Sequence, residues 1–299
     1  MPDQPIYRGR FAPSPTGPLH LGSVFTALAS YLQARSRKGK WLLRIDDLDM
    51  PRNIKGSVDN ILRTLDTLGL HWDESVAFQS QSLYYYHEIL NKLNDDKHIY
   101  PCRCSRKTQT ARYTGFCRDN YFNLDIPHAY RVKTDDSVIS FVDELQGIMT
   151  YPIAEQGDFI LKRKDQVIAY QFAVVVDDHL QAVNHVVRAC DLLDSTPRQL
   201  YLQRLLGFEP PVYMHVPVII DEAGYKLSKQ TQALPVDLNR SNDVIFGVLV
   251  LLKQNPPNWL QQATVTELLD WAVAHWNPMT LKNCKAINNE YLTCRLLEQ

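Results

Sequence analysis

The segment after Tyr7–Phe11 constrains the fold more than any other. This short strand candidate leads into a loop with three prolines and one glycine, APSPTGP, and then into an apolar-periodic stretch from about Leu21 to Arg35 that predicts a helix. Lys40–Ile45 reads as a buried strand, and Ser57 can cap a further helix that stops at Gly69. Strand, helix, strand and helix at this spacing predict an α/β fold with a parallel sheet and right-handed crossovers.

The α/β pattern returns after residue 160. Tyr170–Val176 predicts a buried strand, Thr196-Pro197 a helix start, and Val212–Ile220 another strand. From Leu234 onward the pattern is helical. We therefore expect three parts, which are a catalytic α/β unit over 1–96 and 160–233, an insertion over 97–159, and a small helical C-terminal region over 234–299.

The charge balance excludes a generally basic nucleic-acid-binding chain. Lys and Arg number 32 against 33 Asp and Glu, a net charge of −1, so any nucleic-acid contact must come from a local patch. The longest apolar run, Val244–Leu252, is too short to span a bilayer as a helix, and the first ten residues hold no apolar stretch of signal-peptide length. Six cysteines are too few for a disulfide scaffold. We expect a cytoplasmic monomer with no membrane partner.

Residues 97–133 differ from the rest of this nearly neutral chain. They carry eight basic residues and two acidic ones, interleaved with six aromatic residues. Basic side chains suit phosphates and aromatic rings suit unpaired bases. This stretch predicts an insertion that faces a polyanion.

The same stretch holds three of the six cysteines. Cys102-x-Cys104 and Cys117 offer three thiolate ligands, whereas a structural zinc site takes four ligands in a tetrahedron. No fourth cysteine lies nearby, so His98 or water could complete the site. The alternative is three reduced thiols without a metal.

Two polar loops suit phosphate chemistry. His20-Leu21-Gly22-Ser23 opens a helix, where free backbone N–H groups and the positive end of the helix dipole form an anion site. His20 could reach phosphate oxygens, and Gly22 leaves room for a flat base. The loop Lys226–Lys229 (KLSK) carries two lysines that could neutralise charge as it builds on a phosphate.

These motifs occur together in a known family. The segments at 9–23 (GRFAPSPTGPLHLGS), 170–179 (YQFAVVVDDH), 186–199 (VVRACDLLDSTPRQ) and 226–229 resemble class I aminoacyl-tRNA synthetases in their glutamate-specific form. Ordinary glutamyl-tRNA synthetases are longer, because an anticodon-binding domain follows the KLSK loop. This chain has no room for one, and it resembles the short paralogues, the glutamyl-queuosine tRNA(Asp) synthetases.

The resemblance implies a Rossmann-like fold with a zinc-containing insertion and no anticodon-binding domain. It also implies ATP-dependent activation of L-glutamate, with Mg²⁺, and transfer of the glutamate to the queuosine base in the anticodon of tRNA(Asp). The implied catalytic residues are His20, Lys226 and Lys229, and the implied ATP-binding residues are His20, Gly22, Ser23 and Lys229. The implied glutamate-binding residues are Arg10, Phe11, Ala12, Pro13, Ser14, Asp46, Tyr170 and Arg188, and the implied ligands of one structural zinc ion are Cys102, Cys104, Tyr113 and Cys117.

The sequence departs from the family pattern at two places. Asp46 stands where the family has a glutamate that binds the substrate, so its reach is shorter by about 1.5 Å of covalent chain. A water bridge or a shifted substrate could compensate. Ala189-Cys190 replaces the usual Gly-Ala, and we expect Cys190 to be a small buried side chain beside Arg188.

Three other functions remain open from the sequence. One is a truncated ordinary glutamyl-tRNA synthetase. Another is a small-molecule nucleotidyltransferase of the same fold, against which the basic, aromatic insertion argues. The third is a non-catalytic RNA-binding paralogue, against which the intact His20, Gly22, Lys226 and Lys229 argue.

Overall fold

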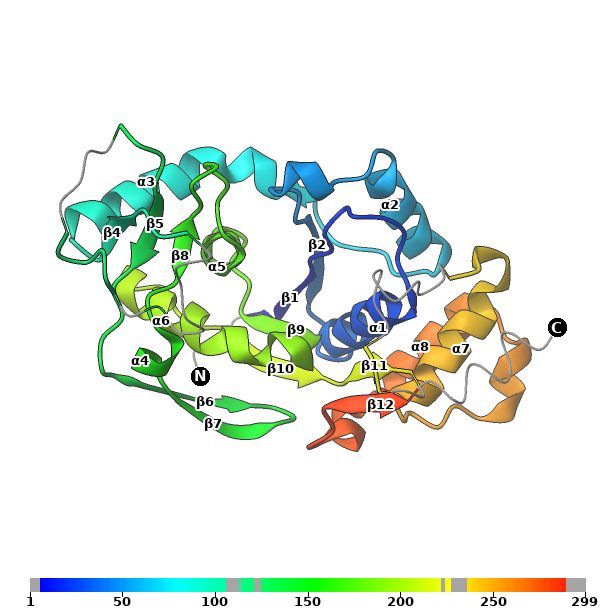
Figure 1. Cartoon of the computed structure of the whole chain (residues 1–299). Coiled ribbons are helices and arrows are strands. Elements are labelled where there is room, and N and C mark those ends of the chain that lie inside the picture. Colours follow the sequence, from blue (N-terminus) through cyan, green and yellow to red (C-terminus); the bar gives the residue numbers. More distant parts are fainter. Residues whose placement is uncertain are drawn as a thin grey trace.

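Parallel strands lie at the centre of the molecule, as Figure 1 shows for the computed structural model. β1 (Arg8–Phe11) pairs with β2 (Lys40–Ile45), and β2 pairs with β3 (Ala77–Phe78). β9 (His185–Ala189) pairs in parallel with β10 (Val212–Val216). The predicted parallel α/β fold is therefore confirmed. The structure describes residues 6–105, 113, 115–120, 125–221, 224–226 and 236–288.

The two groups of parallel strands meet at β1 and β9. The amide N of Asn184 donates to the carbonyl O of Arg8 at 3.1 Å, and the amide N of Arg8 donates to Asn184 Oδ1 at 2.8 Å. The start of β9 therefore lies beside β1. The carboxyl ends of β1, β2 and β9 consequently open toward one region of the molecule.

The predicted first helix is α1 (Leu21–Ser36), and its side chains are buried on several sides. It packs with the sheet residues and with α7 (Ser241–Leu251) and α8 (Val265–His275) in one hydrophobic core. The apolar run predicted too short to cross a bilayer falls largely in α7. No helix among the described residues is long and apolar enough to cross a membrane.

The helix α2 (Ser57–Thr67) begins differently from the prediction. Gly56, in the left-handed conformation at φ +78°, occupies the N-cap, and Ser57 makes no capping hydrogen bond. Ser57 Oγ instead donates to the carbonyl O of Gly17 and accepts from the amide N of Gly17, at 2.9 and 3.0 Å. This contact fixes the proline-rich loop against α2.

The helix α5 (Tyr170–Leu180) corrects the prediction of a strand over Tyr170–Val176. Consecutive β-branched valines favour a strand. However, the side chains from Phe172 to Val176 are all buried, and an apolar run buried on every side has no period that separates a helix from a strand. As a helix, the segment places Tyr170 and Val174 at the cavity and, one turn further, Asp177 and Asp178 against the arginines of the cavity wall.

The predicted strand over Val212–Ile220 is two strands. Pro217 lacks a backbone N–H and separates β10 from β11 (Val218–Ile220). β11 pairs in parallel with β12 (Ala286–Asn288), so the C-terminal region contains a strand as well as helices. The helix α6 (Thr196–Leu206) begins at the predicted residue and ends before Gly207 at φ +68°.

A smaller antiparallel part lies between β3 and α5. Its first sheet has the order β4 (Ile99–Cys102), β5 (Ala129–Val132) and β8 (Ile160–Lys162). A hairpin of β6 (Val138–Asp143) and β7 (Gly147–Pro152) joins β10 through the pair Tyr213–Asp143. The remaining helices here are α3 (Leu83–Asp95) and α4 (Ile153–Gln156).

Candidate active site

A cavity of about 450 Å³ lies where β1, β2 and β9 end, and it extends to the start of α1. The proposed glutamate and nucleotide residues that the structure describes all line this cavity. They are Arg10, Phe11, Ala12, Pro13, Ser14, His20, Gly22, Ser23, Asp46, Tyr170, Arg188 and Lys226. Lys229 lies outside the described residues.

His20 is the N-cap residue of α1. Its Nδ1 accepts the amide N–H of Ser23 at 3.4 Å, and its Nε2 lies 3.2 Å from Ser23 Oγ. The imidazole is therefore fixed over the first turn of the helix, beside Gly22. The positive end of the dipole of this 16-residue helix faces the same cavity, which suits an anion.

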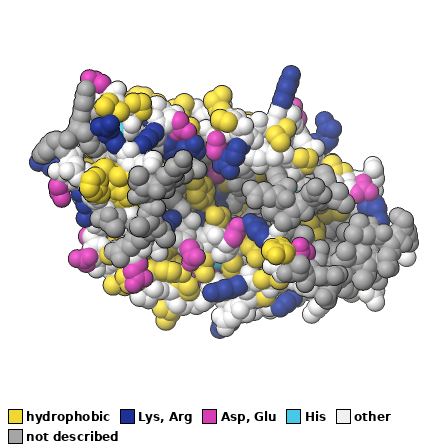
Figure 2. All heavy atoms as spheres, in the orientation of Figure 1, with side chains coloured by type: hydrophobic (Ala, Val, Ile, Leu, Met, Phe, Trp, Pro, Cys, Tyr) yellow, Lys and Arg dark blue, Asp and Glu magenta, His cyan; other side chains and the backbone are white. Residues whose placement is uncertain are grey.

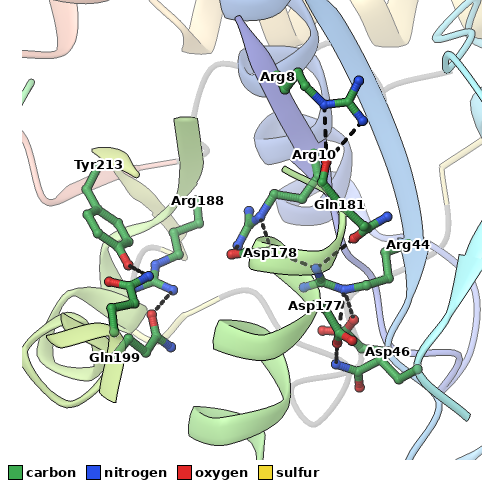
Figure 3. A network of polar contacts seen from close by, with 12 residues as sticks. Arg8, Arg10, Arg44, Asp46, Asp177, Asp178, Gln181, Arg188, Gln199 and Tyr213 are labelled. Atoms are coloured by element: carbon green, nitrogen blue, oxygen red, sulfur yellow. Dashed lines mark hydrogen bonds and ion pairs between the residues drawn. The ribbon is translucent and has the colours of Figure 1, made fainter. Parts of the chain in front are cut away.

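Arg10 and Arg44 share one buried carboxylate, as Figure 3 shows. Arg10 donates from Nε and Nη2 to the two oxygens of Asp178, at 3.1 and 3.3 Å. Arg44 Nη1 donates to Asp178 Oδ1 at 2.6 Å. Both arginines are at most 4% exposed. Asp178 therefore orients the two guanidinium groups at the cavity wall.

Asp46 and Asp177 complete this cluster of charges. Arg44 Nε donates to Asp46 Oδ1 at 2.8 Å and lies 3.7 Å from Asp177 Oδ2. Asp177 also accepts hydrogen bonds from the Tyr86 hydroxyl at 2.6 Å and from Gln79 Nε2 at 2.7 Å. Three carboxylates thus surround two guanidinium groups, and the excess negative charge suits the cationic group of a ligand.

Burial and nearby charges shift the pKa values of the three carboxyl groups in different directions. Burial raises the pKa of Asp177 to about 6, although Arg44 opposes the shift. Burial also raises the pKa of Asp46 against the opposing effect of Arg44. Burial acts in the same direction on Asp178, but Arg10 and Arg44 outweigh it and lower the pKa of that group.

Arg188 stands apart from this cluster and has its own partners (Figure 3). Its Nη1 donates to Gln199 Oε1 at 2.7 Å, and its Nη2 donates to Thr196 Oγ1 at 2.8 Å. Its guanidinium carbon lies 5.2 Å from the centroid of the Tyr213 ring, within cation–π range. Arg188 is 4% exposed and lines the cavity.

The predicted small residue beside Arg188 is Cys190, which is half-buried. Its Sγ donates to the carbonyl O of His215 at 3.4 Å. Burial raises the pKa of this thiol to about 12, so it stays protonated. The side chain serves packing.

Lys226, the first lysine of the KLSK loop, also lines the cavity. Its ammonium forms an ion pair with Asp191, which also lines the cavity. Both side chains are partly exposed, at 44% and 38%. Of the KLSK loop, the structure describes Lys226.

Sequence reasoning missed Arg44, Asp178 and Asp191. Arg44 lies two residues before Asp46 in β2, and residues two apart in a strand share one face, so the signal was present. The signal for Asp178 was hidden because the strand was predicted to end at Val176, whereas α5 continues to Leu180 and carries Asp178 to Arg10 and Arg44.

The three cysteines of the insertion lie together. The Sγ atoms of Cys102, Cys104 and Cys117 are all within 4.8 Å of one another. The Tyr113 hydroxyl lies 3.4 Å from Cys102 Sγ and 3.5 Å from Cys104 Sγ. Zinc–sulfur bonds of about 2.3 Å in a tetrahedron require sulfur–sulfur distances of this size. The donor set therefore fits a zinc ion.

The positive charge of Arg131 beside this cluster favours negatively charged metal ligands. Arg131 Nε donates to Cys102 Sγ at 3.2 Å, and the Arg131 guanidinium lies 3.9 Å from the centre of the Tyr113 ring. Burial raises the pKa of Tyr113 above its usual value, so a phenolate there requires a cation. Arg131 and Tyr100 are each 4% exposed, so these two residues of the stretch are not available to a polyanion.

The comparisons with known proteins identify the family. Residues 7–246 match the family described as "tRNA synthetases class I (E and Q), catalytic domain". The protein named Glutamyl-Q tRNA(Asp) synthetase in Methylococcus capsulatus is 47% identical over 276 residues, with 91% of each chain covered. The protein of the same name in Pseudomonas aeruginosa is 42% identical, with 96% of this chain and 99% of that protein covered.

The solved structures agree on the fold. A glutamate tRNA ligase from Elizabethkingia meningosepticum, in complex with its amino acid, has a TM-score of 0.80 at 23% identity. The alignment covers 95% of this chain and 67% of that chain. A glutamate-tRNA synthetase from Elizabethkingia anophelis gives a TM-score of 0.79 at the same identity. From these matches, the chain belongs to the class I tRNA synthetase family described as E and Q and, within it, to the group of proteins named glutamyl-Q tRNA(Asp) synthetase.

Proposed function

We propose that this chain activates L-glutamate with ATP and transfers it to the queuosine base in the anticodon of tRNA(Asp). The single observation that carries the proposal is the cavity at the ends of β1, β2 and β9. It gathers two buried arginines, a buried carboxylate and a helix N-terminus, which match the chemical groups of glutamate and ATP. The names of the relatives supply the acceptor.

Glutamate carries two carboxylates and one ammonium group. Arg10 and Arg188 are the arginines we assign to the carboxylates, because guanidinium forks pair with them in two hydrogen bonds. We assign Asp46 to the ammonium group. Tyr170, as the first residue of α5, is 39% exposed at the cavity and can close the pocket with its ring.

The first step joins glutamate to AMP. The α-carboxylate oxygen attacks the α-phosphorus of ATP, and pyrophosphate leaves. His20, Lys226 and Lys229 are proposed to hold the phosphates as negative charge builds on them, with Mg²⁺ accompanying the ATP. In the second step a hydroxyl of the queuosine diol attacks the glutamyl carbonyl carbon, and AMP leaves.

The insertion is proposed to contact the anticodon stem-loop. Among its described residues, Arg103 and Phe116 are exposed, Phe116 at 71%, whereas Arg118 is paired with Asp158. On the face shown in Figure 2, basic and acidic side chains are interspersed among the described residues. The proposed contact is therefore local. The division of the chain into 1–96 with 160–233, 97–159 and 234–299 stays part of this proposal.

Two assays test the proposal. ATP–pyrophosphate exchange should depend on glutamate, and labelled glutamate should be transferred to tRNA(Asp) that contains queuosine. Transfer to tRNA(Glu), or equal transfer to tRNA(Asp) lacking queuosine, would favour a truncated glutamyl-tRNA synthetase. Exchange without any transfer to RNA would favour a small-molecule nucleotidyltransferase, and the absence of exchange would favour a non-catalytic paralogue. Lys229→Ala should abolish exchange.

A further inference from the structure

A buried histidine stands behind Arg188. Arg188 Nε donates to His215 Nε2 at 3.0 Å, and His215 is 0% exposed. His215 lies in the middle of β10, opposite Arg188 of β9 in the strand register. It does not line the cavity, so its contact with a substrate could only be indirect.

The second ring nitrogen of His215 faces a carboxylate. His215 Nδ1 lies 2.6 Å from Asp143 Oδ2, and Asp143 is 1% exposed. The backbone amide groups of Leu145 and Gln146 donate to Asp143 Oδ1 at 3.1 and 2.9 Å. Although burial acts to raise the pKa of Asp143, the hydrogen bonds from His215 and from the backbone of Gln146 lower it. Asp143 is therefore an ionised acceptor.

The tautomer of His215 follows from the partners of its two ring nitrogens. An ionised carboxylate accepts only, so Nδ1 carries the hydrogen. A guanidinium donates only, so Nε2 carries a lone pair. The Thr196 hydroxyl, 3.3 Å from Nε2, accepts from Arg188 and can donate to the same lone pair.

We propose that His215 is a positioning residue, held by Asp143 in the Nδ1–H tautomer so that Nε2 orients Arg188 toward a carboxylate of the amino-acid substrate. The assignment of the substrate rests on the proposed function. The contacts from Gln199 and Thr196 fix two other nitrogens of Arg188, and His215 fixes the third. The guanidinium plane is thereby set before a ligand arrives.

Protonation of His215 would break this arrangement. A proton on Nε2 would face the Arg188 guanidinium at 3.0 Å, so one of the two cations would have to move. The charged and titratable groups around the ring are Asp143 on β6, Arg188 on β9, Arg10 on β1 and Tyr213 on β10 itself. Burial above all lowers the pKa of His215 from 6.5, Arg188 lowers it further, and Asp143 opposes them. The neutral ring therefore holds at pH 7, and glutamate affinity should fall as the solution is acidified.

A pair of substitutions separates the two contacts of the ring. His215→Gln can place an amide oxygen near the position of Nε2, whereas His215→Asn can place an amide N–H near the position of Nδ1. His275→Asn is the matched control, because His275 is an exposed histidine of α8. Glutamate binding is measured by calorimetry, and the KM values for glutamate and ATP are measured by pyrophosphate exchange.

The expected results differ between the two variants. His215→Asn should weaken glutamate binding ~10-fold or more, with the KM for ATP unchanged, because Arg188 loses one acceptor. His215→Gln should stay within about threefold of the wild type and the control. As the pH falls from about 7.5 to well below 6.5, the wild type should lose more affinity than His215→Gln, in which His20, Asp46 and Asp177 remain near the pocket but the buried ring is absent. Equal affinities in both variants, or equal pH profiles in wild type and His215→Gln, would overturn the proposal.

A nitrogen NMR spectrum of selectively labelled histidine tests the tautomer without any assay of activity. The proposal requires a hydrogen on Nδ1 and none on Nε2 at pH 7. A hydrogen on Nε2 would overturn it, whatever the substrate. A wild type that binds no glutamate but shows the Nδ1–H tautomer would instead contradict the proposed function and leave the ring's orientation of Arg188 supported.

Discussion

Arg44 and Asp178 form a buried ion pair in which Nη1 lies 2.6 Å from Oδ1, and the two side chains are 1% and 7% exposed. Asp178 also pairs with Arg10, whereas Arg44 has Asp46 and Asp177 as further carboxylate partners. Arg44 Nη2 has no hydrogen-bond partner in the described part of the chain. One nitrogen of the cluster therefore lacks an acceptor among the described residues, although the carboxylates outnumber the guanidinium groups.

Asp178→Asn should be strongly destabilising, because the buried Arg10 loses its carboxylate partner and the buried Arg44 loses one of three. We expect a loss of about 3–5 kcal/mol in the free energy of unfolding at pH 7, measured by urea denaturation. The pKa of Asp178 is lowered from 3.8, so its stabilisation is present above that pH and is lost as the pH falls through the folded-state value. Asp66→Asn, at an exposed site, is the control. An Asp178→Asn variant as stable as the control would show that other groups compensate the arginines.

Asp177 should have the opposite pH dependence. Its pKa is raised from 3.8 to about 6, so the folded state binds its proton more tightly and stability falls as the pH rises from about 4 to 7. The shift corresponds to about 3 kcal/mol. In Asp177→Asn this part of the pH dependence should be missing, because Gln79 can turn its amide to accept from the new NH₂ group. Parallel pH profiles for the variant and the wild type would contradict the assignment.

The helix α5, which the sequence predicted as a strand, shows where sequence patterns are informative and where they are not. The loop residues before α1 and the strand β2 are local in the sequence, and their pattern predicted both elements and their position at one site. Arg10 and Asp178 are 168 residues apart, and the pairing depends on β1 lying beside α5 in the folded chain. The bond between Asp143 and His215 likewise depends on the register of β6 and β10. Composition and period carry no such long-range register. The roles of the cavity residues, the absence of an anticodon-binding domain and the domain boundaries stay predictions.

Lys226→Ala should reduce glutamate-dependent pyrophosphate exchange by about a hundredfold, because one charged donor to the transferring phosphate is lost. The ion pair with Asp191 is partly exposed, so the free energy of unfolding should change little. Lys92→Ala on α3 is an exposed control that should leave exchange unchanged. Exchange at the wild-type rate in Lys226→Ala would assign the phosphate contact elsewhere, and Lys229 would then be the first residue to examine.

The cysteine cluster should hold one zinc ion per chain, which elemental analysis of protein purified without chelator would measure. Cys117→Ser should remove the zinc and lower the melting temperature, because the metal links Cys117 to Cys102 and Cys104. Tyr113→Phe tests the fourth ligand separately. His98, the alternative fourth ligand, does not lie with the three cysteines, so full zinc content in Tyr113→Phe would assign the fourth position to water. Wild-type protein without zinc would contradict the site itself.

Asp46 allows the sharpest test of the amino-acid pocket, because its two functions can be separated. Asp46→Asn keeps an acceptor for Arg44 Nε, which lies 2.8 Å from Oδ1, but removes the negative charge. If the carboxylate binds the ammonium group of glutamate, the KM for glutamate should rise ~10-fold or more with the KM for ATP unchanged, since a hydrogen bond to a charged group is worth about 1.5–3 kcal/mol.

Asp46→Glu is the complementary variant. It introduces the side chain that the family resemblance implies at this position and lengthens the reach into the cavity by about 1.5 Å. We expect glutamate affinity to be retained or increased, because residue 46 and Arg44 both line the cavity and Arg44 can still pair with the longer carboxylate. A glutamate KM that is unchanged in Asp46→Asn would show that Asp46 only orients Arg44, and the ammonium group would then have to be bound by another acceptor.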